Sequence, residues 1–144
     1  MRTSVKIPLV ILSALALFAG CKSSPAKAGY LRAVDGYAVQ FIQWTQEGQQ
    51  IKGTVEILER KETEPLSVMF EGVLDGEHFS ITTKDGKPME KITGGLKGDT
   101  LTLFVQNEPE HEPGPPEFHR ATRAEYNEAA RQLEMRAKLN KGAY

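Results

Sequence analysis

The chain has 144 residues, a single cysteine, and 18 basic residues against 19 acidic ones, which gives a formal net charge of −1. This balance excludes the basic face that nucleic-acid binding requires, and the single cysteine excludes an internal disulfide framework. We therefore expect one domain, which typically holds about 100–150 residues, folded around an ordinary apolar core and without a nucleic-acid partner.

The first 20 residues have the pattern of an export signal. Arg2 and Lys6 precede an apolar run over 7–18, which is shorter than the roughly 20 residues that a membrane-spanning helix needs. A basic start, a short apolar run and small residues before a cleavage point are typical of a secretory signal peptide. We therefore predict a signal peptide over 1–20.

The residues around the lone cysteine resemble the lipobox of bacterial lipoproteins, in the sequence Leu17-Phe18-Ala19-Gly20-Cys21. In that motif the cysteine thiol receives a diacylglyceryl group and becomes the new N-terminus, and Leu usually stands where this chain has Phe18. The resemblance implies a lipid attached to Cys21, a lipidated tether over 21–29, and anchoring in the cell membrane or the outer membrane. The alternative is an ordinary signal peptide that leaves Cys21 as a free thiol.

Alternating apolar and polar residues predict a series of strands between positions 37 and 106. Asp75-Gly76 and Lys97-Gly98 are typical of tight hairpin turns, so we expect a positive φ at Gly76 and Gly98. Consecutive hairpins build an antiparallel meander, so the predicted fold class is mainly β. We expect about 6–8 strands in a small barrel or a strongly curved sheet. The predicted strands cover 37–44, 51–57, 66–74, 79–81, 92–96 and 101–105.

Two hairpins repeat one pattern 22 residues apart, in which Phe70, Gly72 and Leu74 correspond to Ile92, Gly94 and Leu96. The strand glycines, with Gly53, share a face with large apolar side chains. Glycine weakens a strand unless the sheet bends sharply or another backbone approaches closely. These glycines favour a curved sheet that closes into a barrel over a flat open sheet.

The C-terminal part predicts one helix. Thr122 and Glu125 have the spacing of a capping box, and Tyr126, Ala130 and Leu133 recur at helical spacing. We predict a helix over 122–139, within a domain spanning 30–141. Alternation on the strands places Tyr37, Val39 and Phe41 on the inner face. We expect the helix to cover outward apolar residues, which by the same alternation are Ile42, Trp44, Leu58, Met69, Val73 and Phe104.

Taken together, these patterns resemble a family of uncharacterised bacterial lipoproteins over roughly 37–133. The residues that carry the resemblance are Phe41-Ile42-Gln43-Trp44-Thr45, Gly48, Ile51-x-Gly53-Thr54, the two glycine hairpins and Phe118-x-x-Ala121-x-x-x-x-Tyr126-Asn127-x-Ala129. The resemblance implies the fold and the anchor, and it implies no activity. This chain departs from the family in the proline-rich stretch 108–116.

Three aromatic residues are candidates for ligand binding. Tyr30, Tyr37 and Trp44 cluster early in the chain, and aromatic rows near a barrel mouth are favoured binding sites. Core packing is the alternative interpretation, and it is favoured for Trp44. The predicted function is a membrane-anchored envelope lipoprotein that acts as a binding or interaction module for an unknown envelope ligand or protein.

The sequence carries no recognised catalytic motif, so we predict no catalytic residue, metal or cofactor. The alternative function is an envelope hydrolase that uses His78 or the carboxylates of Glu71 and Glu77. His111 lies among glutamates in the segment 107–117, where a solvated acidic loop is favoured over a metal site.

Overall fold

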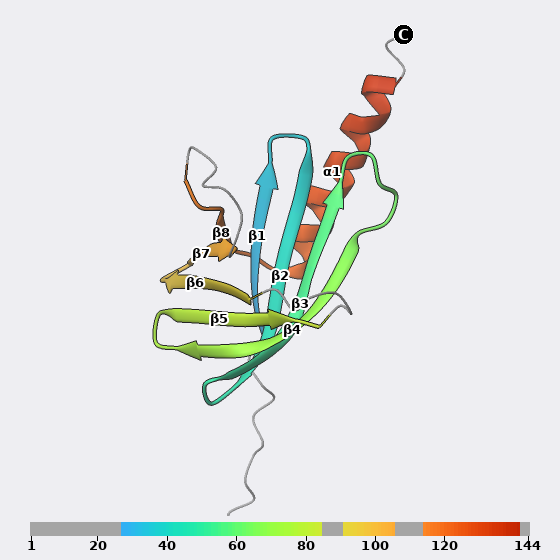
Figure 1. Cartoon of the computed structure of the whole chain (residues 1–144). Helices are drawn as coiled ribbons and strands as arrows, with labels where there is room; N and C mark the ends of the chain where they lie inside the picture. The colour runs from blue at the N-terminus through green and yellow to red at the C-terminus, as the bar shows by residue number, and fades with distance from the viewer. Residues whose placement is uncertain (1–26, 85–90, 106–113, 142–144) are drawn as a thin grey trace, which may run out of the picture.

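The protein is an eight-stranded antiparallel meander that closes into a barrel, with one C-terminal helix on its outside (Figure 1). The computed structural model describes residues 27–84, 91–105 and 114–141. The predicted signal peptide, Cys21 and His111 lie outside these ranges. The elements are β1 (Lys27–Val34), β2 (Ala38–Glu47), β3 (Gln50–Glu59), β4 (Leu66–Asp75), β5 (His78–Thr83), β6 (Lys91–Lys97), β7 (Thr100–Val105), β8 (Glu117–Arg120) and α1 (Arg123–Lys141).

The two strands that the sequence did not predict, β1 and β8, are those that close the barrel. β8 has four residues and pairs with β7 on one side and with β1 on the other, where Tyr30 lies opposite Arg120 and Leu31 opposite His119. β1 begins at Lys27, inside the stretch predicted as a tether. The predicted meander is thus confirmed, and its closure comes from segments too short or too rich in small residues to show alternation.

The barrel interior is filled by apolar and aromatic side chains. The rings of Tyr30 and Trp44 stack 5.1 Å apart, and Trp44 also contacts Phe79 at 5.3 Å. An eight-stranded barrel has an interior just wide enough for side chains to fill. The buried members of this interior core are Tyr30, Ile42, Trp44, Ile51, Phe70, Leu74, Phe79, Ile81, Leu101, Leu103 and Phe118.

The strand glycines allow neighbouring strands to approach closely, as predicted. At Gly53, Gly72 and Gly94 an added Cβ would overlap a carbonyl oxygen of the adjacent strand. The overlapped oxygens belong to Gln43, Ser80 and Thr102, in that order. Side chains are therefore excluded at these three positions by the tight curvature of the barrel.

The two repeated hairpins form β4–β5 and β6–β7, and their turns depend on glycine. Gly76 and Gly98 have φ of 59° and 60°, which confirms the predicted left-handed conformation that residues other than glycine adopt only at a cost. The turn residues are Gly76 and Glu77, because Asp75 is already paired with His78 in the ladder. The turn therefore lies one position later than the Asp75-Gly76 pair that signalled it.

The helix covers a different face of β2 from the one expected. Val39 and Phe41 lie beneath α1 together with Leu58, whereas Ile42 and Trp44 point into the barrel. The prediction that Ile42 and Trp44 face outward is therefore wrong. Both faces of β2 are apolar, so alternation along β2 alone could not tell the two faces apart.

The register of the sheet fixes the face that turns inward. Trp44 lies opposite Gly53 and Ile42 opposite Val55, and Gly53 leaves room in the interior for the neighbouring aromatic rings. Among the other residues predicted to face outward, Leu58 is buried under the helix as expected. Met69 and Phe104 remain 60% and 52% exposed, beyond the reach of the helix.

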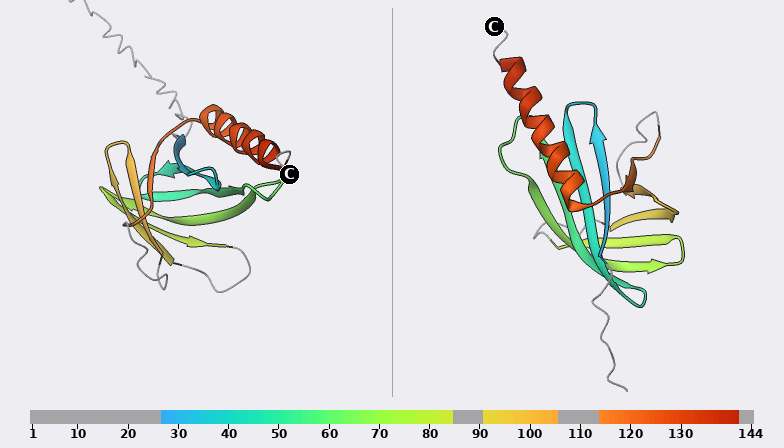
Figure 2. Two further views of the ribbon diagram at one scale, coloured as in Figure 1. Left: turned by 90° about the horizontal axis from the view of Figure 1, so that it is seen from above. Right: turned by 180° about the vertical axis from the view of Figure 1, so that it is seen from behind.

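The helix begins with the predicted capping box and ends two residues later than expected, at Lys141. The Glu125 N–H donates to Thr122 Oγ1 at 3.2 Å, and the Thr122 N–H donates to Glu125 Oε2 at 2.6 Å. Tyr126 and Leu133 are each only 4% exposed and pack on the outer face of β2 and β3. Figure 2 shows α1 running along the outside of the barrel, with its C-terminal end projecting beyond the strands. No helix in the described part of the chain is long and apolar enough to cross a bilayer.

Candidate functional site

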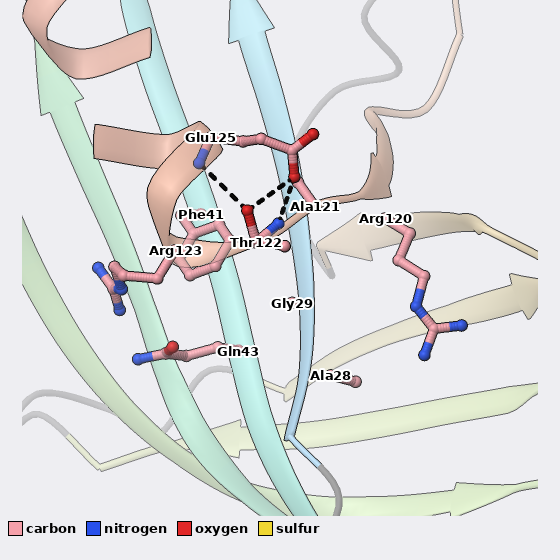
Figure 3. Close-up of a pocket in the computed structure, with 9 residues that line it drawn as sticks. All are labelled: Ala28, Gly29, Phe41, Gln43, Arg120, Ala121, Thr122, Arg123 and Glu125. Carbon is pink, nitrogen blue, oxygen red and sulfur yellow. Dashed lines mark hydrogen bonds between the residues drawn. The ribbon is translucent and has the colours of Figure 1, made fainter. Parts of the chain in front are cut away.

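A groove of about 400 Å³ lies where β1, β2 and the start of α1 meet. Its walls come from the first residues of β1, the middle of β2 and the connection between β8 and α1 (Figure 3). The lining residues are Ala28, Gly29, Phe41, Gln43, Arg120, Ala121, Thr122, Arg123 and Glu125. We take this groove as the candidate site because charged and polar groups from β2, β8 and the start of α1 line it.

Small residues on β1 bring the connection against the floor of the groove. The Ala121 N–H donates to the Gly29 carbonyl oxygen at 2.9 Å. A Cβ at Gly29 would lie 2.6 Å from the Ala121 carbonyl oxygen and 2.8 Å from the Phe41 ring. Only glycine at this position lets the connection pass over Phe41, so the shape of the groove depends on Gly29.

On one side of the groove, Arg123 ties the helix to the barrel. Its guanidinium makes two hydrogen bonds of 2.7 Å to the carboxylate of Glu56 on β3. The same group lies 4.7 Å from the centre of the Phe41 ring and 5.2 Å from that of Tyr126. The hydrogen bonds to Glu56 raise the pKa of Arg123. Arg123 is thus held by a two-pronged ion pair and by cation–π contacts, and its role is to position the helix.

The capping box forms another part of the lining. The backbone N–H and side chain of Thr122 both hydrogen-bond the Glu125 carboxylate, and they lower its pKa. The groove therefore carries a fixed negative charge at the helix start, which compensates part of the positive charge of its two arginines.

On the opposite side of the groove, Arg120 extends toward solvent (Figure 3). Its side chain is 60% exposed, and its contact with Asp99 is 3.5 Å long. A guanidinium has five N–H donors, so most of those on Arg120 are available to a ligand. Arg120 and the carboxamide of Gln43 give the groove hydrogen-bond donors for a molecule that presents acceptor oxygens. The Phe41 ring is only 1% exposed beneath Arg123 and Tyr126, so it shapes the groove without offering a free surface.

The three aromatic candidates from the sequence lie at separate places. Tyr30 and Trp44 are 2% exposed and stack inside the barrel, where burial raises the pKa of Tyr30. Tyr37 is 53% exposed beside the β1–β2 turn. Tyr37 and Trp44 are seven positions apart, which corresponds to about 23 Å of extended chain. Ligand binding by these residues stays a prediction, and any ligand of Tyr30 or Trp44 would have to enter the packed interior.

The residues named for the hydrolase alternative lie on the outer surface. His78 and Glu77 are exposed next to the β4–β5 turn. Glu71 contacts Lys84 at 2.5 Å and Lys52 at 3.6 Å, and the hydrogen bond from Lys84 lowers its pKa. A carboxyl group that acts as a general acid needs a raised pKa. The lowered pKa of Glu71 therefore fits a surface ion pair with lysine and does not fit that catalytic role. Within the described ranges, no three histidine, cysteine or carboxylate residues are grouped as metal ligands would be.

The sequence reasoning missed the groove residues Arg120 and Arg123 and the partner Glu56. Glu56 and Arg123 are 67 positions apart, and no spacing rule connects a strand carboxylate with an arginine in the first turn of a distant helix. The only available signal was the capping box, whose second residue is Arg123.

A scan against protein-family models finds none that matches this chain, and no curated protein or solved structure matches it. The resemblance to uncharacterised lipoproteins therefore stays an expectation from the sequence.

Proposed function

We propose that this protein is a lipid-anchored lipoprotein of the bacterial envelope whose barrel acts as a binding module. The anchor is proposed from the signal-like segment 1–20 and the lipobox-like residues that end at Cys21. The binding role rests on one observation, the groove beside the start of β1 that is lined by the polar side chains of Arg120 and Gln43.

The packed interior is the reason for placing the binding site on the outer surface. Streptavidin-like binding would need a hollow barrel, whereas here stacked rings occupy the centre. At the groove, a ligand with carboxylate or phosphate oxygens would accept hydrogen bonds from Arg120 and from the carboxamide N–H groups of Gln43. The groove is open to solvent, so it also suits an exposed part of a larger envelope molecule.

Photocrosslinking in intact cells tests the proposal. A photoreactive amino acid at Gln43 should give a discrete crosslinked product, because this side chain lines the groove. The same amino acid at Thr93, on β6, is the matched control away from the groove. Arg120→Ala should weaken the Gln43 product several-fold, whereas Lys97→Ala, which removes an exposed cation elsewhere, should leave it unchanged.

Equal crosslinking from Gln43 and Thr93, or a Gln43 product that does not respond to Arg120→Ala, would contradict binding at the groove. The anchor is tested separately. Cys21→Ala should leave an unprocessed or mislocalised precursor, and a variant with an unchanged mature mass that still partitions into detergent would contradict lipidation.

A further inference from the structure

The helix α1 has a second apolar strip on the side that faces away from the barrel. Tyr126 and Leu133 form the docked side, each 4% exposed. Met135 and Leu139 are 43% and 74% exposed. Residues four positions apart lie on one side of a helix, so these two side chains form a continuous ridge in the C-terminal half of α1, which we call the outer ridge.

Basic residues flank the outer ridge. The Arg131 guanidinium lies 3.8 Å from the Met135 sulfur, although its charge is paired with Glu128 at 2.6 Å. Arg136 and Lys138 have no ion pair among the described residues. The helix dipole favours cations in the last turn, but it gives no reason for two large apolar side chains to face water. Exposed apolar residues beside unpaired cations allow a contact with the anionic surface of a membrane.

The start of the helix lies next to the start of β1. The hydrogen bond from Ala121 to Gly29 joins the residue two positions before α1 to the third residue of β1. The two views in Figure 2 show α1 on the outside of the barrel, with its outer side uncovered by any strand. Lys27 comes six positions after Cys21, and an extended chain spans roughly 20 Å over six positions. A barrel anchored at Cys21 can therefore turn α1 toward the lipid surface.

We propose that the outer ridge rests on anionic lipid headgroups, so that the anchored barrel lies on its side with α1 along the membrane. This inference deepens the proposed function, because it depends on the anchor to hold the helix near the bilayer. Two apolar side chains and two cations make a weak contact by themselves. A tether of this length gives the helix an effective concentration of about millimolar at the membrane. At that concentration a weak contact is sufficient to hold the helix on the lipid surface.

A fluorophore beside the ridge tests the contact on the lipidated full-length protein. Because lipidation consumes the only native thiol, Gln132→Cys can be labelled uniquely with a polarity-sensitive dye, and Leu66→Cys, on β4, is the matched control label. The labelled proteins are placed in vesicles of phosphatidylcholine alone and of phosphatidylcholine with phosphatidylglycerol. The dye at 132 should shift to the blue in the anionic vesicles only, and high salt should reverse the shift.

The double substitution Met135→Glu with Leu139→Glu should abolish the shift, whereas Leu66→Glu with Phe104→Glu should preserve it, since these residues are exposed on the barrel. Identical emission in both vesicle types overturns the proposal. A shift that appears only after acidic envelope proteins are added also overturns it, in favour of a protein partner. The mass of the N-terminal peptide reports lipidation independently. If Cys21 is unmodified, the proposed anchor fails. The Gln132→Cys label is then placed in a Cys21→Ser background, and dye emission with vesicles added from solution still decides the role of the ridge.

Discussion

The barrel has two apolar clusters, one on each face of β2, and they are held in different ways. The interior core is enclosed on all sides by strands, and its centre is a set of ring contacts around Trp44. The outer cluster, formed by Val39, Phe41, Leu58, Tyr126 and Leu133, is closed by a single helix. The strands alone are therefore enough to bury the interior core, whereas the outer cluster is buried only while α1 is docked.

The largest effect is expected from the interior. Phe79 is 1% exposed and contacts the rings of both Trp44 and Phe70. Phe79→Ala should lower the free energy of unfolding by about 3–5 kcal/mol, because it leaves a cavity among side chains that cannot collapse into it. Chemical denaturation followed by tryptophan fluorescence measures this loss. A loss as small as that of an exposed substitution would show that the interior is not the main source of stability.

A smaller effect is expected from the outer cluster. Leu133→Asp removes a buried contact of α1, worth about 2 kcal/mol, and places a charge against Val39 and Phe41. Helical circular dichroism should then be lost at a lower temperature than the fluorescence transition of Trp44. Leu139→Asp is the matched control, because this leucine is 74% exposed. Coincident transitions in the Leu133→Asp protein would mean that helix and barrel unfold as one unit.

The smallest effect concerns the helix start. Thr122→Ala should cost about 1 kcal/mol at neutral pH, because it removes the capping hydroxyl. The pKa of Glu125 is lowered in the folded protein, so its contribution is present above the ordinary carboxylate pKa and is lost as pH falls through the folded pKa.

The wild type and Thr122→Ala should therefore differ less in melting temperature under acidic conditions than at neutral pH. An equal difference at both pH values would place the effect of Thr122→Ala in the loss of the acceptor for the Glu125 N–H, not in the loss of the hydroxyl's hydrogen bond to the Glu125 carboxylate.

Much of the fold could be predicted because its signals are local. The hairpin turns need glycine at a positive φ, and Gly76 and Gly98 mark them in the sequence. The capping box, a pattern of four residues from Thr122 to Glu125, likewise marks the start of the helix in the sequence. Alternation located six strands of the meander, since each has polar residues on at least part of one face.

The parts of the fold and of the groove that the sequence did not predict depend on contacts between distant segments. The inner face of β2 is chosen by the room that Gly53 leaves opposite Trp44, and alternation carries no information about volume. The four residues of β8 form a strand only because β1 and β7 are already in place beside them. The groove arises from Gly29, Arg120 and Arg123, which come together only after the barrel closes.

The short strand β8 also sets an order of events for a chain that is synthesised from its N-terminus. β1 can pair with β2 at once, but its other edge has to wait for Arg120, almost a whole domain later in the chain. Contacts of such long sequence separation carry a high entropy of loop closure and slow folding. Until the last quarter of the chain arrives, β1 presents an open edge that other chains can pair with. Truncation before β8 would therefore produce an aggregating meander, so the C-terminal segment serves as the closing step of the whole domain.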